Sequence, residues 1–293
     1  MTRIGIPLPP HFSFDAVVRS HGWYDLPPFV YDQAAGVLKT ALTPALSRGE
    51  REAAPVTFRA SDGSLRASSP GLSGRELRRL AARVFSLDVD LSDFARAVQD
   101  PALRSAVLRG GGRMLRAPTL FEDAVKMLLT TTCSWEATRG MITRLIAAAG
   151  AGGSAFPSPD AVAALSARLL RERVRCGYRA QALLLFARRV ASGRLDLAAW
   201  EDSARPARDV REEILGERGF GPYAAEGLLR ILGRHEFLAL DSWSRQKYRR
   251  LYPGPARATD RSIARRYARF GRFRGLALWL ELTGDWREAQ ERL

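Results

Sequence analysis

The chain has 293 residues, an apolar content of 46% and a formal net charge of +15 at pH 7. This length holds one large domain or two modest ones, and no apolar run reaches the roughly 18–20 residues that a membrane helix needs. Two cysteines are too few for a disulfide framework, and the excess of bases predicts a polyanionic partner, because basic surface binds by releasing counterions from phosphates.

Residues 1–72 predict a small antiparallel β-domain. Short alternating apolar runs, broken by proline and glycine, indicate that strands dominate residues 12–70. The segment 54–68 predicts a hairpin with its turn at Ser61–Gly63. The polar stretch at residues 43–54 has no such pattern and is interpreted as an insertion between strands.

The apolar period changes to a helical one at residue 73. Ser73 is a typical helix cap, and the apolar residues after it recur at the spacing of one helix face. We therefore predict an α+β fold in which residues 73–293 form an all-helical domain. The expected helices lie within 73–85, 90–100, 101–109, 118–132, 134–150, 158–165, 167–175, 178–193, 204–218, 221–233, 242–252, 259–270 and 273–284.

Residues 210–232 predict two amphipathic helices joined by a tight turn that contains Gly219 and Gly221. Both glycines permit positive φ and leave the turn backbone bare, and Pro222 suits a first helical position, whose free N–H groups favour an anion. The turn is either a main-chain phosphate site or an ordinary helical hairpin. The lone acid Asp241 then follows in an apolar stretch, where it either serves chemistry, caps the next helix, or does both.

The hairpin, the apolar helix and the acid after them resemble the helix-hairpin-helix DNA glycosylases with the Gly-Pro-Asp signature. The segments 119–150, 156–165 and 175–190 are similar to the 8-oxoguanine glycosylase branch, and the N-terminal β-domain corresponds to the extra domain of that branch and of 3-methyladenine glycosylase II. The resemblance spans residues 73–285. It implies a cytoplasmic, nucleoid-associated monomer that binds double-stranded DNA in base-excision repair and has no membrane contact.

The resemblance also implies roles for individual residues in the substrate pocket. Asp241, ionised, would stabilise the positive charge that builds on the sugar as the base departs. Tyr223 occupies the position at which lyase members carry a Schiff-base lysine, and a phenol cannot form that adduct, so no lyase activity is expected. The expected pocket lining is Tyr223, Trp135, Cys133 and Trp243.

A second group of residues is implied to hold DNA. The hairpin residues Gly219, Phe220 and Gly221 would grip the backbone, with Glu217 beside them where the family has a proline. Tyr178 would wedge beside the flipped site and Arg179 would contact the orphaned base. Arg245 and Lys247 begin a basic region, residues 245–274, in which the sequence shows only Asp260 as an opposing charge.

No cofactor is expected. The iron–sulfur members carry four cysteines after the catalytic acid, whereas none follows Cys176 here, and the three histidines form no ligand pattern. A monovalent cation held by hairpin carbonyls is compatible with the resemblance. The predicted function is a monofunctional DNA glycosylase that excises a damaged, alkylated purine. The alternatives are an oxidised-purine glycosylase of the 8-oxoguanine type, a non-catalytic damaged-DNA-binding protein and a basic helical scaffold that binds RNA.

Overall fold

The computed structural model describes residues 1–43, 53–61, 63–253 and 259–284. Its N-terminal part is a five-stranded antiparallel sheet of order β1-β5-β4-β3-β2. Leu38 pairs with Phe58, which pairs with Ala67, and these three side chains are buried on one face, as alternation along a strand requires. The strands are β1 (Thr2–Pro7), β2 (Val30–Asp32), β3 (Val37–Leu42), β4 (Ala54–Ser61) and β5 (Ser64–Ser69).

The expected hairpin is confirmed, since β4 and β5 are neighbours and Ser61 pairs with Ser64. Residue 62 of its turn and residues 44–52 of the insertion lie outside the described residues. The expectation of strands throughout 12–70 was wrong at its start. There the chain forms α1 (Phe14–Val18), capped by Ser13, and a 3₁₀ turn, η1 (Gly22–Asp25). Phe14, Val17 and Val18 fall at helical spacing and are buried, in a run too short for its period to be read from the sequence.

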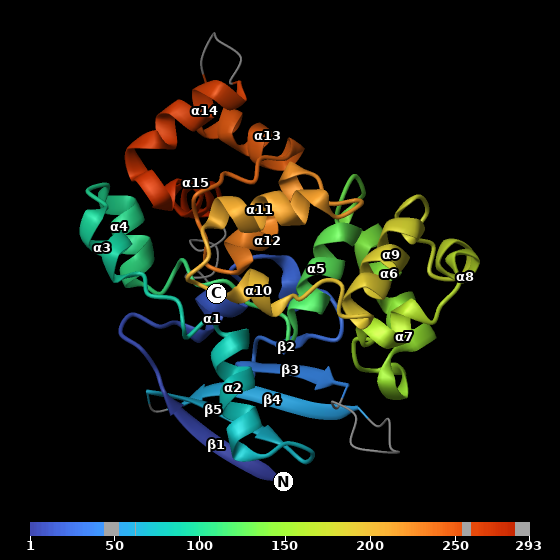
Figure 1. Ribbon diagram of the computed structural model, residues 1–293. Coiled ribbons are helices and arrows are strands. Elements are labelled where there is room, and N and C mark those ends of the chain that lie inside the picture. The colour runs from blue at the N-terminus through green and yellow to red at the C-terminus, as the bar shows by residue number, and fades with distance from the viewer. Residues whose placement is uncertain (44–52, 62, 254–258, 285–293) are drawn as a thin grey trace.

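The first helix of the predicted helical region, α2 (Gly74–Val84), covers the sheet. Ser73 and Glu76 form a capping box at its start, as the Ser73 cap predicted. The helix packs against β1 and β5, and Figure 1 shows it lying across them. One apolar core then continues from the inner face of the sheet into the helices. The division at residue 72/73 remains a prediction, because α2 shares its core with the sheet.

The expected helices after α2 are all present, and a short one, α10, was not expected. The helices gather into two groups above the sheet, with α11 and α12 between them in Figure 1. Their bounds are α3 (Ser92–Ala97), α4 (Pro101–Leu108), α5 (Leu120–Leu129), α6 (Trp135–Ala149), α7 (Pro159–Ala163), α8 (Ala167–Glu172), α9 (Arg179–Ala191), α10 (Ala198–Glu201), α11 (Ala207–Gly216), α12 (Pro222–Ile231), α13 (Ser242–Leu251), α14 (Asp260–Tyr267) and α15 (Arg274–Leu282).

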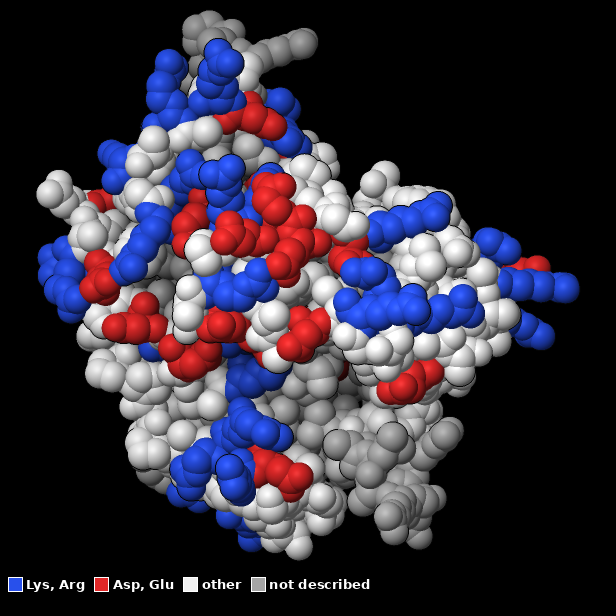
Figure 2. All heavy atoms as spheres, viewed as in Figure 1, with Lys and Arg blue, Asp and Glu red and all other residues white. Residues whose placement is uncertain are grey.

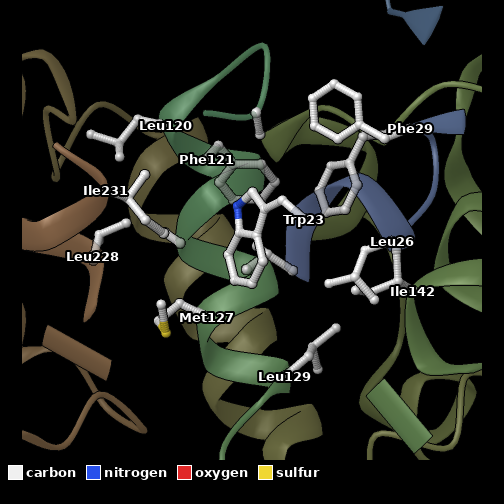
Figure 3. Packing of buried hydrophobic residues seen from close by; sticks show 14 of the residues in the cluster. Trp23, Leu26, Phe29, Leu120, Phe121, Met127, Leu129, Ile142, Leu228 and Ile231 are labelled. Carbon is white, nitrogen blue, oxygen red and sulfur yellow. The ribbon is translucent and has the colours of Figure 1, made fainter. Parts of the chain in front are cut away.

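Two apolar clusters underlie this arrangement. The larger joins the sheet to α1, α2, α5, α6, α9, α11 and α12, and the smaller joins α3, α4, α13, α14 and α15. Figure 3 shows Trp23 of η1, Phe121 and Met127 of α5 and Ile231 of α12, which all belong to the larger cluster. Within the described ranges, no helix is long and apolar enough to cross a membrane.

Candidate functional site

A pocket of about 740 Å³ lies where the two apolar clusters meet. Its lining comes from η1, α5 and α12 on one side and from α13 and α15 on the other. Asp241 and all four predicted pocket residues, Tyr223, Trp135, Cys133 and Trp243, line it together. The volume is in the range of small-molecule sites and accommodates an extruded nucleotide base.

Asp241 is both the N-cap of α13 and a wall of this pocket. Its Oδ1 accepts a hydrogen bond of 2.7 Å from the Ser244 amide, and Ser244 Oγ accepts one of 2.7 Å from the Asp241 amide. No donor to Oδ2 is found in the part of the chain that the structure describes. The carboxylate thus lies at the N-terminus of α13, close to the free N–H groups of the first helical turn. The cap interpretation is therefore confirmed, and one carboxylate oxygen is left for a ligand.

Tyr223 lies in the first turn of α12 and stays a neutral phenol. Burial raises its pKa, and the negative charge of Asp241 raises it further. No amine replaces it, because none of the three lysines of the sequence lines the pocket. Lys126 is fully buried and forms an ion pair with Glu122 at 2.7 Å. The described pocket walls thus offer no primary amine for a Schiff base.

Aromatic side chains that the sequence did not single out complete one wall. The Trp23 and Trp135 rings stack with centroids 6.5 Å apart. Trp135 Nε1 donates to Asp25 Oδ2 at 2.7 Å, and Trp23 Nε1 donates to Asp123 Oδ1 at 2.8 Å. His21 lies edge-on to Trp23, and burial lowers its pKa to about 3, so it is a neutral wall residue. The wall is held rigidly, because each indole has a carboxylate partner.

Asp123 is the buried support of this wall. Besides Trp23, its carboxylate accepts hydrogen bonds of 2.8 Å from the Ala117 amide and 2.8 Å from Arg83 Nη2. A carboxylate is tolerated at this depth only with such partners. The network therefore connects α2 and α5 to the pocket wall.

A pair of residues from α12 and α15, which the sequence also did not single out, forms another part of the lining. The guanidinium carbon of Arg230, near the end of α12, lies 4.0 Å from the centroid of the Trp279 ring. Trp279 Nε1 donates to the Ser20 carbonyl at 3.0 Å, and its ring tilts against Trp243 at 5.9 Å. Cys133, in contrast, turns its thiol to the Leu129 carbonyl at 3.1 Å. It lines the pocket as an ordinary thiol with a main-chain acceptor.

The hairpin turn precedes α12, and its two glycines differ. Gly219 has φ of +93° and uses the freedom that its missing side chain permits, whereas Gly221 has φ of −87°, which any residue can adopt. Phe220 is 3% exposed and packs on Phe186 at 5.1 Å, which makes it an apolar plug beneath the turn. Glu217 is buried and forms an ion pair with Arg189 at 3.1 Å, which turns its charge away from the bare turn.

Tyr178 and Arg179, two further predicted DNA contacts, lie at the start of α9. Tyr178 is 70% exposed, as an intercalating wedge would be. Arg179 is only 6% exposed; its guanidinium lies 4.4 Å from the Tyr178 ring and donates to Thr131 Oγ1 at 3.2 Å and to the Thr131 carbonyl. In this arrangement Arg179 holds the loop after α5 in place, and its contact with an orphaned base stays a prediction.

The basic region is less one-sided than its sequence indicated. Arg245 pairs with Asp260 at 2.7 Å as the sequence allowed, but Arg266 and Arg272 also meet Glu281 and Asp93 from other elements. Figure 2 shows the basic side chains over α13 and α14, and acidic side chains gathered over α11 in the middle of this face. Lys247 lies partly exposed on α13, and the exposed arginines of α13 and α14 are Arg249, Arg250, Arg261, Arg265 and Arg266.

Within residues 1–43, 53–61, 63–253 and 259–284, no group of three His, Cys, Asp or Glu side chains is placed to hold an ion.

The sheet and the helices above it form the fold of the 8-oxoguanine and 3-methyladenine DNA glycosylases, as comparison with solved structures shows. MBOgg1 bound to a low-affinity DNA ligand has a TM-score of 0.76 and 18% identity over 98% of this chain and 97% of that one. The Clostridium acetobutylicum 8-oxoguanine glycosylase/lyase in its apo form has a TM-score of 0.73 and 17% identity over 96% of each chain. The Archaeoglobus fulgidus 3-methyladenine DNA glycosylase has a TM-score of 0.73 and 21% identity over 98% of this chain and 99% of that one.

No family model matches the sequence, and no curated protein matches it. The α+β architecture predicted from the sequence is confirmed by the sheet and by these structures. The resemblance that the sequence motifs indicated is confirmed at the level of the fold.

Proposed function

We propose that this chain is a DNA glycosylase that hydrolyses the N-glycosidic bond of a damaged purine and leaves the strand intact. The observation that supports this most directly is Asp241, whose carboxylate is fixed at a helix N-terminus inside an aromatic pocket. A purely structural cap has no need of a pocket of about 740 Å³ beside it.

The proposed reaction begins with a nucleotide rotated out of the duplex into the pocket. As the bond between C1′ and the base breaks, its electron pair leaves with the base and positive charge builds on the sugar. The ionised Asp241 stabilises that charge, and a water molecule adds to C1′. Tyr223, in place of an amine, supports hydrolysis over a covalent intermediate, so we propose that lyase activity is absent.

Double-stranded DNA is the proposed partner. The bare Gly219–Gly221 turn opens α12 with free N–H groups suited to a phosphate, and exposed arginines on α13 and α14 supply sequence-independent attraction. A protein of similar fold, the C. acetobutylicum enzyme, was solved with DNA containing cytosine opposite 8-oxoguanine. We propose that the protein binds DNA as a monomer.

The pocket walls accept any flat base, because every base has a π-face that stacks on an indole. A cationic alkylated purine would gain cation–π attraction from the wall of Trp23 and Trp135. An oxidised purine is the second candidate, since proteins of similar fold act on 8-oxoguanine. Stacking does not distinguish an alkylated purine from an oxidised one, whereas charged side chains inside the pocket would.

Release of free base from duplexes with defined lesions tests the function, with wild type compared to Asp241→Asn. Asparagine keeps an N-cap acceptor, so the variant should fold while single-turnover release falls at least about 10²-fold. The matched control is Asp100→Asn, since Asp100 caps α4 through the amides of Ala102 and Leu103 and does not line the pocket. Equal release by wild type and Asp241→Asn would overturn the mechanism.

Two further measurements separate the alternatives. Borohydride should trap no covalent protein–DNA adduct, and an adduct would restore an amine-based lyase. A wild type that binds lesion-containing duplex tightly and releases no base would instead be a damaged-DNA-binding protein. Preference for RNA over duplex DNA in competition would indicate the RNA-binding scaffold.

A further inference from the structure

Arg230 is a cation in the pocket that the proposed mechanism does not yet use. It lines the same pocket as Asp241 and Tyr223, and it is partly exposed there. Burial lowers its pKa and the nearby Asp241 raises it, and a guanidinium stays protonated throughout the range of protein assays. Arg19 also lines the pocket, but its charge is paired with Asp15 at 2.9 Å. Arg230 places a further positive charge in the pocket that holds Asp241.

The donors of this guanidinium have no protein acceptor among the described residues. Its contact with the structure is the face of Trp279 at 4.0 Å. That indole is itself fixed by its bond of 3.0 Å to the Ser20 carbonyl. Stacking holds the guanidinium plane while leaving its N–H edges for acceptors in that plane. An arginine fixed in this way is a prepared donor for a ligand that brings acceptors.

The chemistry of such a ligand follows from the charge. A cationic alkylated base would be repelled by Arg230, because like charges in a partly desolvated pocket act strongly on each other. A neutral purine with a carbonyl at C6 would be attracted, since guanidinium pairs with the O6 edge of a purine.

We propose that Arg230 recognises a neutral 6-oxopurine and stabilises the negative charge that this base acquires as it leaves. When the C1′–N9 bond breaks, its electron pair passes to N9 and is delocalised to O6, which the guanidinium faces. The water oxygen bonds to C1′ and releases one proton, which reaches the departing base through solvent. Asp241 and Arg230 thus oppose the two charges that bond cleavage separates.

This inference rests on the proposed glycosylase function and turns its substrate class away from the alkylated purines expected from the sequence. A cationic base is already a good leaving group and needs no stabilising cation. A neutral base departs as an anion, so the positive charge of Arg230 assists departure of the neutral class alone.

The test compares wild type with Arg230→Met, Arg230→Lys and the control Arg272→Met in single-turnover release. The duplexes contain hypoxanthine or 8-oxoguanine as neutral probes and 7-methylguanine or 3-methyladenine as cationic ones. Arg230→Met should lower release of a neutral base by about 10²- to 10³-fold and leave cationic bases unchanged or faster. Release of a neutral base by Arg230→Lys should lie between the wild-type and Arg230→Met rates. Arg272 stacks on Phe273 at 4.8 Å outside this pocket, so its variant should leave the ratio of the two classes unchanged.

Equal loss on both classes, or an unchanged ratio in Arg230→Met, would make Arg230 a structural residue. Release of cationic bases alone by the wild type would also overturn the inference while keeping the glycosylase. Release of no base by the wild type would overturn both. Thermal unfolding of each variant separates misfolding from loss of chemistry, and Arg230→Lys keeps the test open if Arg230→Met does not fold.

Discussion

The hairpin turn offers two glycines whose replacement should have different effects. A Cβ on Gly219 would stand 2.8 Å from Ala182 Cβ and 2.8 Å from Leu128 Cδ1, at φ of +93°. Left-handed backbone costs a non-glycine residue about 1–2 kcal/mol, and overpacking adds about 1–3 kcal/mol. Gly219→Ala should therefore lower stability by about 2–5 kcal/mol, which in a chain of this size lowers Tm by roughly 3–8 °C.

Gly221 should behave in the opposite way. Its φ is −87°, and a Cβ there would meet nothing within 4 Å, so Gly221→Ala costs the fold under about 1 kcal/mol as a poorer N-cap. The added methyl group would stand beside the free N–H groups that open α12. Losing one charge-assisted hydrogen bond to phosphate is worth about 1.5–3 kcal/mol, so affinity for duplex DNA should fall about tenfold or more.

Thermal unfolding by circular dichroism and anisotropy of a labelled duplex at fixed salt measure the two effects. Gly193→Ala is the matched control, because Gly193 has φ of +70° with nothing within 4 Å of its Cβ. It should show the backbone cost without the clash and keep DNA affinity. Wild-type affinity in Gly221→Ala would refute the phosphate role of the turn. An unchanged Tm in Gly219→Ala would refute the conformation given to the turn.

Burial lowers the pKa of both His21 and His235 from 6.5 to about 3, so between these values the unfolded chain binds protons that the folded chain does not. Stability should fall as pH drops from 6.5, by about 1.4 kcal/mol per unit for each histidine, and urea unfolding at pH 7 and pH 5 measures this; a flat profile would contradict it. Lys126→Met should cost about 3–5 kcal/mol by leaving Glu122 buried and unpaired, and adding Glu122→Leu should restore most of it in the same urea assay. Affinity for duplex DNA should fall about 10³-fold or more between 50 and 200 mM salt, and a loss under tenfold would argue against phosphate tracking.

The sequence identified the parts of the pocket that depend on local motifs. Asp241 and Tyr223 follow the hairpin at short range, and Trp135 and Cys133 belong to the loop and helix start that resemble a known family. All of them line one pocket in the structure. The helices were predictable for a related reason, because their apolar period and caps such as Ser73 are encoded within a few residues.

The missed residues depend on contacts between distant parts of the chain. Trp23 sits in a 3₁₀ turn without readable period, and its carboxylate partner Asp123 is 100 residues away. Arg230 occupies the last turn of a helix, where arginine is common, and its position over Trp279 requires the folded chain. Counting charges along the basic region failed for the same reason, since Asp93 comes from α3.

Asp241 combines two roles that different substitutions separate. Asn keeps an acceptor for the Ser244 amide and removes the charge, whereas Ala removes both and should cost about 1 kcal/mol of stability. The expected order of stability is therefore wild type and Asn together, then Ala. The expected order of base release is wild type far above Asn and Ala, which should be alike, because neither opposes positive charge on the sugar. If release instead followed stability across the three proteins, Asp241 would serve the fold alone, and the chemistry would have to come from another group in the pocket.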